Sequence, residues 1–229
     1  MREVSVIAIA KSKEELKPLI SALKKQSFQD FELVTSQKKG IPQALNDAIS
    51  KAKGKILVIT ESDAMPLTNT WLEEMVKAVK KHDEKTIIRG IEIRQTPWCW
   101  VNIACYSSIL KNNKMDESFE LAEDTELFTR LNGLGYKGSE LPAAPVLHEK
   151  RSKGFWNSIR NSFTYGNLLV KINLKYNNID FNPEKIKGSN IIKREIQTIL
   201  SRIAFLLGAT VGFIDHNLSG KKNDRKTNN

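Results

Sequence analysis

Short apolar runs and helical apolar patterns alternate along the amino-terminal part of the chain. The apolar runs predict strands, because strands that are buried on both faces read as continuous hydrophobic segments. They cover residues 4–10, 31–35, 55–60 and 86–93. The segments between them repeat leucine, isoleucine and alanine at helical spacing, which predicts helices. These helices cover residues 12–26, 41–54 and 69–82.

This alternation determines the expected fold class. It predicts an α/β fold with a mostly parallel central sheet and helices on both faces. In an open sheet of this kind, ligands bind beyond the carboxyl ends of the strands. Functional side chains are therefore expected where the predicted strands end.

The pattern is less regular after residue 95. Here it predicts a helix that ends in a glycine-rich turn, a strand, and two basic amphipathic helices. These elements cover residues 122–138, 142–150, 153–176 and 190–218. The polar tail is predicted to be disordered. We therefore divide the chain into a first domain, a basic helical extension and a tail, which cover residues 1–150, 151–218 and 219–229.

Positive charge is concentrated in the last third of the chain. Residues 1–148 carry 21 basic and 20 acidic side chains, a balance of +1, whereas residues 149–229 carry 15 and 6, a balance of +9. Such a bias suits an anionic partner, either a membrane surface or a nucleic acid. No nucleic-acid-binding motif accompanies the charge, so a nucleic acid is not expected.

Aromatic and apolar residues accompany this charge and favour the membrane. Phe155 and Trp156 stand among lysine and arginine, and residues 203–214 form an apolar run of 12 residues. Such a run is shorter than the ~18 residues that a spanning helix needs. A basic, amphipathic helix lying in the membrane interface fits better. The alternative is that these helices pack on the first domain and present a solvated basic face.

Cysteine content and the amino terminus point to a cytoplasmic protein. The two cysteines, Cys99 and Cys105, match no zinc spacing and do not make a disulfide framework. A reducing compartment is the simpler interpretation. The first apolar run is not followed by a small-residue cleavage site, so no signal peptide is expected.

The stretch "VITESDAMP", residues 58–66, delivers two carboxylates where a predicted strand ends. Residues i and i+2 of an extended segment point to the same side, so Glu61 and Asp63 can face one ligand. Two carboxylates suit a hard divalent cation. The alternative is a solvated turn that caps the following helix.

Five stretches, in order, resemble family 2 glycosyltransferases, which have the Rossmann-like GT-A fold. They are "VSVIAIA", "ISALKKQSFQDFELV", "GIPQALNDAISKAKGKILVIT", "ESDAMPLTNTWLEEMV" and "MDESFELAEDTELFTRLNGLGYKG". The resemblance covers residues 3–148. It implies transfer of a sugar from a nucleotide-diphosphate donor to an acceptor hydroxyl. "AKSK" and "TSQKKG" replace the family's usual Pro-Thr-Tyr-Asn and Asp-Asp-Gly-Ser, so the nucleotide is left open.

The resemblance also implies roles on the donor side. By its match to the family's Asp-x-Asp motif, Asp63 would hold Mg²⁺ or Mn²⁺ against the diphosphate. Glu61 would lie near the ribose or help to hold the metal, and Asn46 matches a position near the donor. His148 lies near the end of the predicted strand over 142–150, where a histidine of related enzymes can complete the metal site. A structural or surface role for His148 is the alternative.

On the acceptor side, Glu123 and Asp124 match the family's catalytic acidic pair. The resemblance makes Asp124 the general base that takes the acceptor proton, in an inverting displacement. The acidic first turn of a helix would also place these residues here. Arg130 would contact the diphosphate, or simply pair with Glu126 one helical turn away.

Two functional hypotheses follow. The first is a metal-dependent, inverting glycosyltransferase that is peripheral at the cytoplasmic face of the membrane, with a glycan or polyprenyl-linked acceptor. The second is a degenerate, non-catalytic module that binds a membrane or another anionic partner. A pure binding module has no need for Asp63 and Asp124 together.

Overall fold

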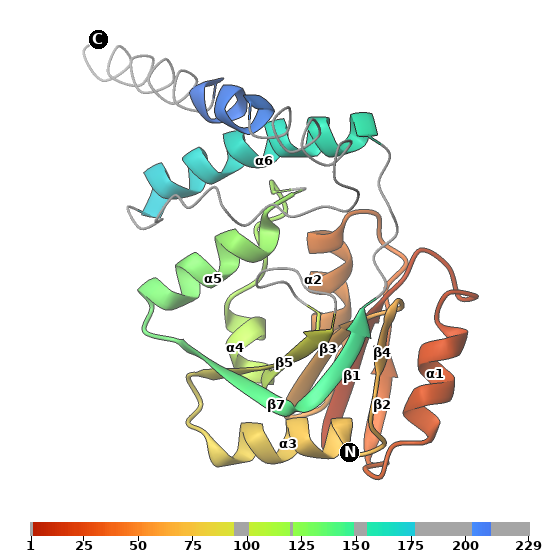
Figure 1. The fold of residues 1–229 in the computed structure, drawn as a ribbon. Helices are drawn as coiled ribbons and strands as arrows, with labels where there is room; N and C mark the ends of the chain where they lie inside the picture. The colour runs from red at the N-terminus through yellow and green to blue at the C-terminus, as the bar shows by residue number, and fades with distance from the viewer. Residues whose placement is uncertain (1, 94–100, 120, 149–154, 177–202, 212–229) are drawn as a thin grey trace. The chain divides into compact units, whose positions relative to one another are not determined.

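Figure 1 shows the computed structural model of the chain. It describes residues 2–93, 101–119, 121–148, 155–176 and 203–211. The chain forms two compact units, Met1–Lys150 and Arg151–Asn229, and each is described by itself. The predicted tail and most of the predicted helix over 190–218 lie outside the described residues.

The first unit is built on a seven-stranded sheet with the order β2-β1-β3-β6-β5-β7-β4. Its strands are β1 (Val4–Ile9), β2 (Phe31–Val34), β3 (Ile56–Glu61), β4 (Ala64–Pro66), β5 (Thr86–Ile93), β6 (Ile103–Tyr106) and β7 (Lys137–His148). β1 pairs in parallel with β2 and β3, and β5 pairs in parallel with β7. β6 is antiparallel to β3 and β5, and β4 is antiparallel to β7.

It follows from these pairings that β1, β2, β3, β5 and β7 share one direction, and that β4 and β6 run the opposite way. The predicted α/β fold with a mostly parallel sheet is therefore confirmed. The sequence did not predict β4 and β6, which are three and four residues long and, unlike β2, do not stand between two predicted helices.

Helices cover both faces of this sheet, as predicted (Figure 1). They are α1 (Lys17–Lys24), α2 (Ile41–Lys51), α3 (Trp71–Lys81), α4 (Ser107–Asn112) and α5 (Glu123–Gly133). α1 and α3 pack with Val4 and Val6 on one face, whereas α2, α4 and α5 pack with Ile7 on the other. Successive residues of β1 thus serve two separate cores, which is why the strand reads as an unbroken apolar run.

The chain reverses between α5 and β7 earlier than the sequence suggested. Gly135 has φ +83° and the amide of Tyr136 donates to the carbonyl of Leu131, so the helix stops before residue 138. β7 then begins at Lys137 and not at residue 142. Residues 137–141, with the sequence KGSEL, are mostly polar, which hid the start of this long strand.

A bulge between β5 and β7 sets the register of the carboxyl end of β7. Gly90 pairs with Leu141, but Glu92 pairs with Val146, so β7 carries extra residues at this point. The side chain of Asn102, itself at φ 63°, donates to the carbonyls of Ile91 and Ala144.

Two neighbours complete the packing around Asn102. Its Oδ1 accepts a 2.7 Å hydrogen bond from the indole of Trp71 on α3. A Cβ at Gly90 would collide with Asn102 Nδ2 and with the carbonyl oxygen of Ala144. This buried polar group therefore requires glycine at position 90 and fixes the bulge.

The second unit contains the long helix α6 (Phe155–Tyr176) and a helical segment over 203–211. The two helices approach closely at two glycines. A Cβ added at Gly166 would collide with the carbonyl oxygen of Phe205, and one added at Gly208 would collide with that of Phe163. Among the helices that the structure describes, none is long and apolar enough to cross a membrane.

Candidate functional site

Glu61 and Asp63 lie where β3 ends, beside the carboxyl end of its partner strand β1. Glu61 is the last residue of β3 and pairs with Ile9 at the end of β1. A two-residue turn follows, and the amide of Ser62 donates to the carbonyl of Ile9 (3.2 Å), which fixes the turn against β1. α3 begins only at Trp71, with Thr70 at its N-cap, so these acids do not cap it.

β7 brings His148 to the same end of the sheet. His148 is the last residue of β7 and pairs with Ala64, the residue after Asp63. Its Nε2 lies 3.6 Å from Asp63 Oδ1 and 3.7 Å from Glu61 Oε2. Residues that are 85 positions apart in the chain therefore form one cluster, because β4 folds back antiparallel along β7.

This cluster has the composition of a cation site. One ligand atom from each of Glu61, Asp63 and His148 lies within 4.8 Å of the other two. Both carboxylates are about one-third exposed, whereas the imidazole is 7% exposed, so the site is half open to solvent. Two carboxylate oxygens and one imidazole nitrogen fit a divalent ion such as Mg²⁺ or Mn²⁺.

The site also contains Glu92, which the sequence did not indicate. Glu92 Oε2 lies 3.2 Å from His148 Nδ1, and its side chain is 1% exposed. Strand alternation through "GIEI" predicts Ile91 and Ile93 inside and Glu92 outside, yet the isoleucines are 41% and 46% exposed. The glycine that precedes this stretch is the one sequence signal that could have suggested an irregular strand.

These carboxylates change the acid–base properties of His148. Its pKa is raised above the ordinary value, mainly by the hydrogen bond with Glu92. Desolvation opposes this rise in pKa, and the negative charges of Glu61 and Asp63 reinforce it. A cation bound at Nε2 would therefore have to displace a more firmly held proton.

Glu123 and Asp124 lie in the first turn of α5. The Oδ1 atom of Asp124 accepts hydrogen bonds from the backbone amide (2.7 Å) and hydroxyl (3.3 Å) of Thr125. The N-cap residue, Ala122, has φ 63°. The catalytic roles of both acids stay predictions.

Asn46 ties α2 to the segment that precedes α5. Its Nδ2 donates to Met115 O (3.0 Å) and Glu117 Oε1 (2.9 Å), and its Oδ1 accepts from the amide of Met115 (2.9 Å). These bonds give Asn46 a structural role in positioning the entry to α5. Its contact with a donor stays a prediction.

Arg130 forms the intrahelical pair that the sequence offered as one alternative. Its Nε and Nη2 bond to the two carboxylate oxygens of Glu126 at 2.9 and 3.2 Å, and Nη2 also donates to Lys114 O. Glu126 is fully buried, so Arg130 neutralises a buried carboxylate. A contact of Arg130 with a diphosphate stays a prediction.

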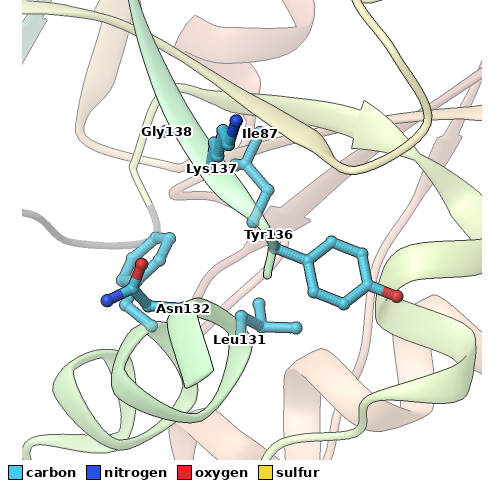
Figure 2. A pocket seen from close by; sticks show the side chains of 7 residues that line it. Ile87, Leu131, Asn132, Tyr136, Lys137 and Gly138 are labelled. Carbon is cyan, nitrogen blue, oxygen red and sulfur yellow. The ribbon is translucent and has the colours of Figure 1, made fainter. Parts of the chain in front are cut away.

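A separate apolar hollow of about 190 Å³ lies at the other end of β7. Figure 2 shows Leu131 and Asn132 of α5 across from Ile87, Lys137 and Gly138 of the two neighbouring strands. The hollow is lined by the start of β7, whereas His148 ends that strand. It is therefore not part of the cluster of Glu61, Asp63 and His148.

Comparison with known proteins gives a consistent family and fold. Residues 6–119 match the family Glycosyl transferase family 2. A similar solved structure is the mannosyltransferase PcManGT from Pyrobaculum calidifontis in complex with GDP-Man and Mn²⁺, at 17% identity and TM-score 0.62. The match covers 91% of this chain and 73% of that chain.

A second similar structure is S. aureus TarS 1-349 in complex with UDP-GlcNAc, at 14% identity and TM-score 0.53. That match covers 90% of this chain and 81% of that chain. The comparison with curated proteins finds no match. The family match, the strand order and these likenesses agree with one another. The chain therefore belongs to glycosyltransferase family 2 and has the GT-A fold.

Proposed function

We propose that this protein is a metal-dependent, inverting glycosyltransferase that uses a nucleotide-diphosphate sugar as its donor. The observation that carries the proposal is the convergence of Glu61, Asp63 and His148 at the carboxyl end of a parallel sheet. The similar mannosyltransferase is described with GDP-Man and Mn²⁺, and TarS with UDP-GlcNAc, which supports a nucleotide sugar and a divalent cation here.

Asp63, Glu61 and His148 would hold Mg²⁺ or Mn²⁺ beside the donor diphosphate. When bound, the cation would neutralise the charge that develops on the leaving diphosphate. Asp124, assisted by Glu123, would accept the proton of the acceptor hydroxyl. The hydroxyl oxygen bonds to the anomeric carbon as the bond from that carbon to the diphosphate oxygen breaks. Attack from the opposite face inverts the anomeric centre.

The acceptor in this proposal is a glycan or a polyprenyl-linked sugar at the cytoplasmic face of the membrane. Support comes from the second unit, where large apolar side chains are exposed. Trp156 is 77% exposed, and Leu206 and Leu207 are 62% and 56% exposed. Basic residues of the same unit would add about 1 kcal/mol each near an anionic membrane surface.

A donor-cleavage assay tests this proposal. The full chain is incubated with UDP-sugars and GDP-sugars and Mn²⁺, and release of the nucleotide diphosphate is measured with and without EDTA. We expect release that EDTA abolishes and that Asp63→Asn lowers by at least about tenfold, because a cation supplies several kcal/mol of charge stabilisation. Asp30→Asn is the matched control, since Asp30 immediately precedes β2 at the opposite end of the sheet.

The same assay separates the enzyme from the non-catalytic module. A module that only binds an anionic partner releases no nucleotide diphosphate from any donor. Release that is equally fast in the wild type and in Asp63→Asn would contradict the metal site instead. These two results overturn different parts of the proposal.

A further inference from the structure

Glu92 is a buried carboxylate in a strand position that should hold an apolar side chain. Its side chain is 1% exposed, whereas Ile91 and Ile93 beside it are 41% and 46% exposed. Burying a charge costs free energy unless the charge is paired. A strand that turns its carboxylate inward and its isoleucines outward breaks a local folding rule, and such violations concentrate at functional sites.

The two carboxylate oxygens of Glu92 face different side chains. Oε1 lies 3.7 Å from the guanidinium of Arg89, and Oε2 lies 3.2 Å from His148 Nδ1. An ionised carboxylate accepts hydrogen bonds and donates none. The hydrogen of this contact therefore sits on Nδ1 of His148.

A hydrogen on Nδ1 determines what the other ring nitrogen can do. In a neutral imidazole, one nitrogen donates and the other carries a free lone pair. With Nδ1 facing Glu92, the lone pair belongs to Nε2, which lies 3.6 Å from Asp63 Oδ1 and 3.7 Å from Glu61 Oε2. Glu92 thus points the metal-binding atom of His148 at the two carboxylates.

We propose that Glu92 is the positioning residue of this site: it holds His148 in the Nδ1–H form, so that Nε2 binds the divalent cation. The inference rests on the proposed function, because it assigns a role towards the same cation. Carboxylates that orient a metal-binding histidine in this way typically change metal affinity 10–100-fold when they are replaced.

The strand arrangement explains how the sheet can build this contact. β7 lies between β5 and β4, so His148 has Glu92 on one side and the turn of Asp63 on the other. The bulge at Gly90 shifts the register of β5 against β7 just before Glu92. The extra residues lie in β7, between Leu141 and Val146, so the shift changes which residues of β7 lie beside Glu92.

Two variants and one control test the proposal in the full chain. Glu92→Gln keeps an acceptor for Nδ1–H but removes the charge, and Glu92→Leu removes both. The control is Glu140→Gln, because Glu140 also lies near the guanidinium of Arg89 (3.9 Å) but does not belong to the His148 cluster. Mn²⁺ affinity is measured by electron paramagnetic resonance, with UDP or GDP present.

We expect Glu92→Leu to weaken Mn²⁺ binding about 10–100-fold, Glu92→Gln to weaken it less, and Glu140→Gln to bind as the wild type does. The second readout is the ¹⁵N chemical shifts of the His148 ring in the metal-free protein at alkaline pH. The wild type and Glu92→Gln should show the Nδ1–H form, and Glu92→Leu a mixture of both forms.

The two readouts separate this inference from the proposed function. Failure of the wild type to bind Mn²⁺ with either nucleotide would overturn the proposed function and the cation role of Glu92 together. If the wild type binds Mn²⁺ and Glu92→Leu, still folded, binds it equally well, only the inference is overturned. Unchanged ring shifts in Glu92→Leu would overturn the orienting role even where folding is perturbed, because those shifts report the ring itself.

Discussion

At the scale of single residues, Asp63 and Asp124 occupy different surroundings, and the proposed function gives them different roles. Asp63 lies with Glu61 and His148 in a cluster that can share one cation. Asp124 stands in the first turn of a helix, where the positive end of the dipole favours a carboxylate. In the proposed function, Asp63 holds the cation and Asp124 takes the acceptor proton.

Replacing Asp124 with asparagine should therefore slow the chemical step without weakening donor binding. A positioned general base contributes about 10²–10⁴-fold to rate, so we expect kcat to fall by that factor while nucleotide affinity is retained. Steady-state kinetics and nucleotide titration together check this. Asp116→Asn is the control, because Asp116 also bonds within its own turn, to Ser118. Turnover near the wild-type rate in Asp124→Asn would move the base elsewhere.

Much of the site could be predicted from single residues, but not its supporting contact. The acid pair stood at a strand end, and His148 followed an apolar stretch, so both were visible in the sequence. Glu92 was hidden because it stands between Ile91 and Ile93, which strand alternation would place inside, although these isoleucines are the exposed residues. Its contact with His148 depends on the pairing of β5 with β7, which a single sequence does not display.

At the scale of elements, the regularly alternating strands and helices were predicted, whereas β4, β6 and the start of β7 were not. β1, β3 and β5 were predicted to within a residue or so, because each is six or more residues long and consists mainly of apolar residues. β4 and β6 exist because neighbouring strands offer them partners. Tertiary pairing, which a single sequence does not display, decided these elements.

The bulge beside Gly90 gives a stability prediction at this scale. Gly90→Ala places a Cβ against Asn102 and the Ala144 carbonyl, and overpacking of this kind costs about 1–3 kcal/mol of unfolding free energy. Gly133→Ala is the matched control, because nothing lies within 4 Å of its added Cβ. We expect it to be neutral or to stabilise by about 0.4–1 kcal/mol. Urea unfolding of both variants checks the contrast, and equal stabilities would contradict the packing.

The edge of the sheet gives a pH-dependent prediction. Glu32 on β2 accepts hydrogen bonds from Ser5 Oγ (2.6 Å) and the Lys53 amide (2.7 Å). The Ser5 bond is the main cause that lowers the pKa of Glu32 below its ordinary value of 4.5. A lowered folded-state pKa stabilises the protein above that ordinary value, and the stabilisation is lost as the pH falls through the folded-state pKa.

Glu32→Gln should therefore destabilise the protein by about 1 kcal/mol at neutral pH and by less in acid. Urea unfolding at neutral pH and below pH 4.5 measures the two differences. Glu84→Gln, an exposed glutamate in the turn before β5, is the control. If the difference in unfolding free energy between Glu32→Gln and the wild type grows in acid, the pKa of Glu32 is not lowered by folding.

At the scale of the whole molecule, charge and exposed apolar surface coincide in the second unit. Residues 149–229 carry the balance of +9, and Leu206 and Leu207 of the helical segment over 203–211 are more than half exposed. A peripheral membrane protein combines these two properties. The first unit, with a balance of +1 over residues 1–148, has no comparable bias.

Liposome flotation of the full chain tests this combination. We expect binding to vesicles that contain anionic lipid and weaker binding to neutral ones. The double variant Leu206→Ser with Leu207→Ser should bind at least about tenfold more weakly, because burying one leucine is worth about 1.5–3 kcal/mol. Leu134→Ser, which changes a leucine of the first unit that is 52% exposed, is the control. Undiminished binding by the double variant would exclude these leucines as the anchor.

The proposed function requires that Glu61, Asp63 and His148 hold a cation against a nucleotide diphosphate. Isothermal titration of UDP and GDP into the full chain, with and without Mn²⁺, measures this directly. We expect one nucleotide to bind only with Mn²⁺, and Asp63→Asn to weaken this binding at least about tenfold, because replacing even a residue that only supports a metal ligand costs that much affinity. Binding that is the same without Mn²⁺, or the same in Asp63→Asn, would contradict it.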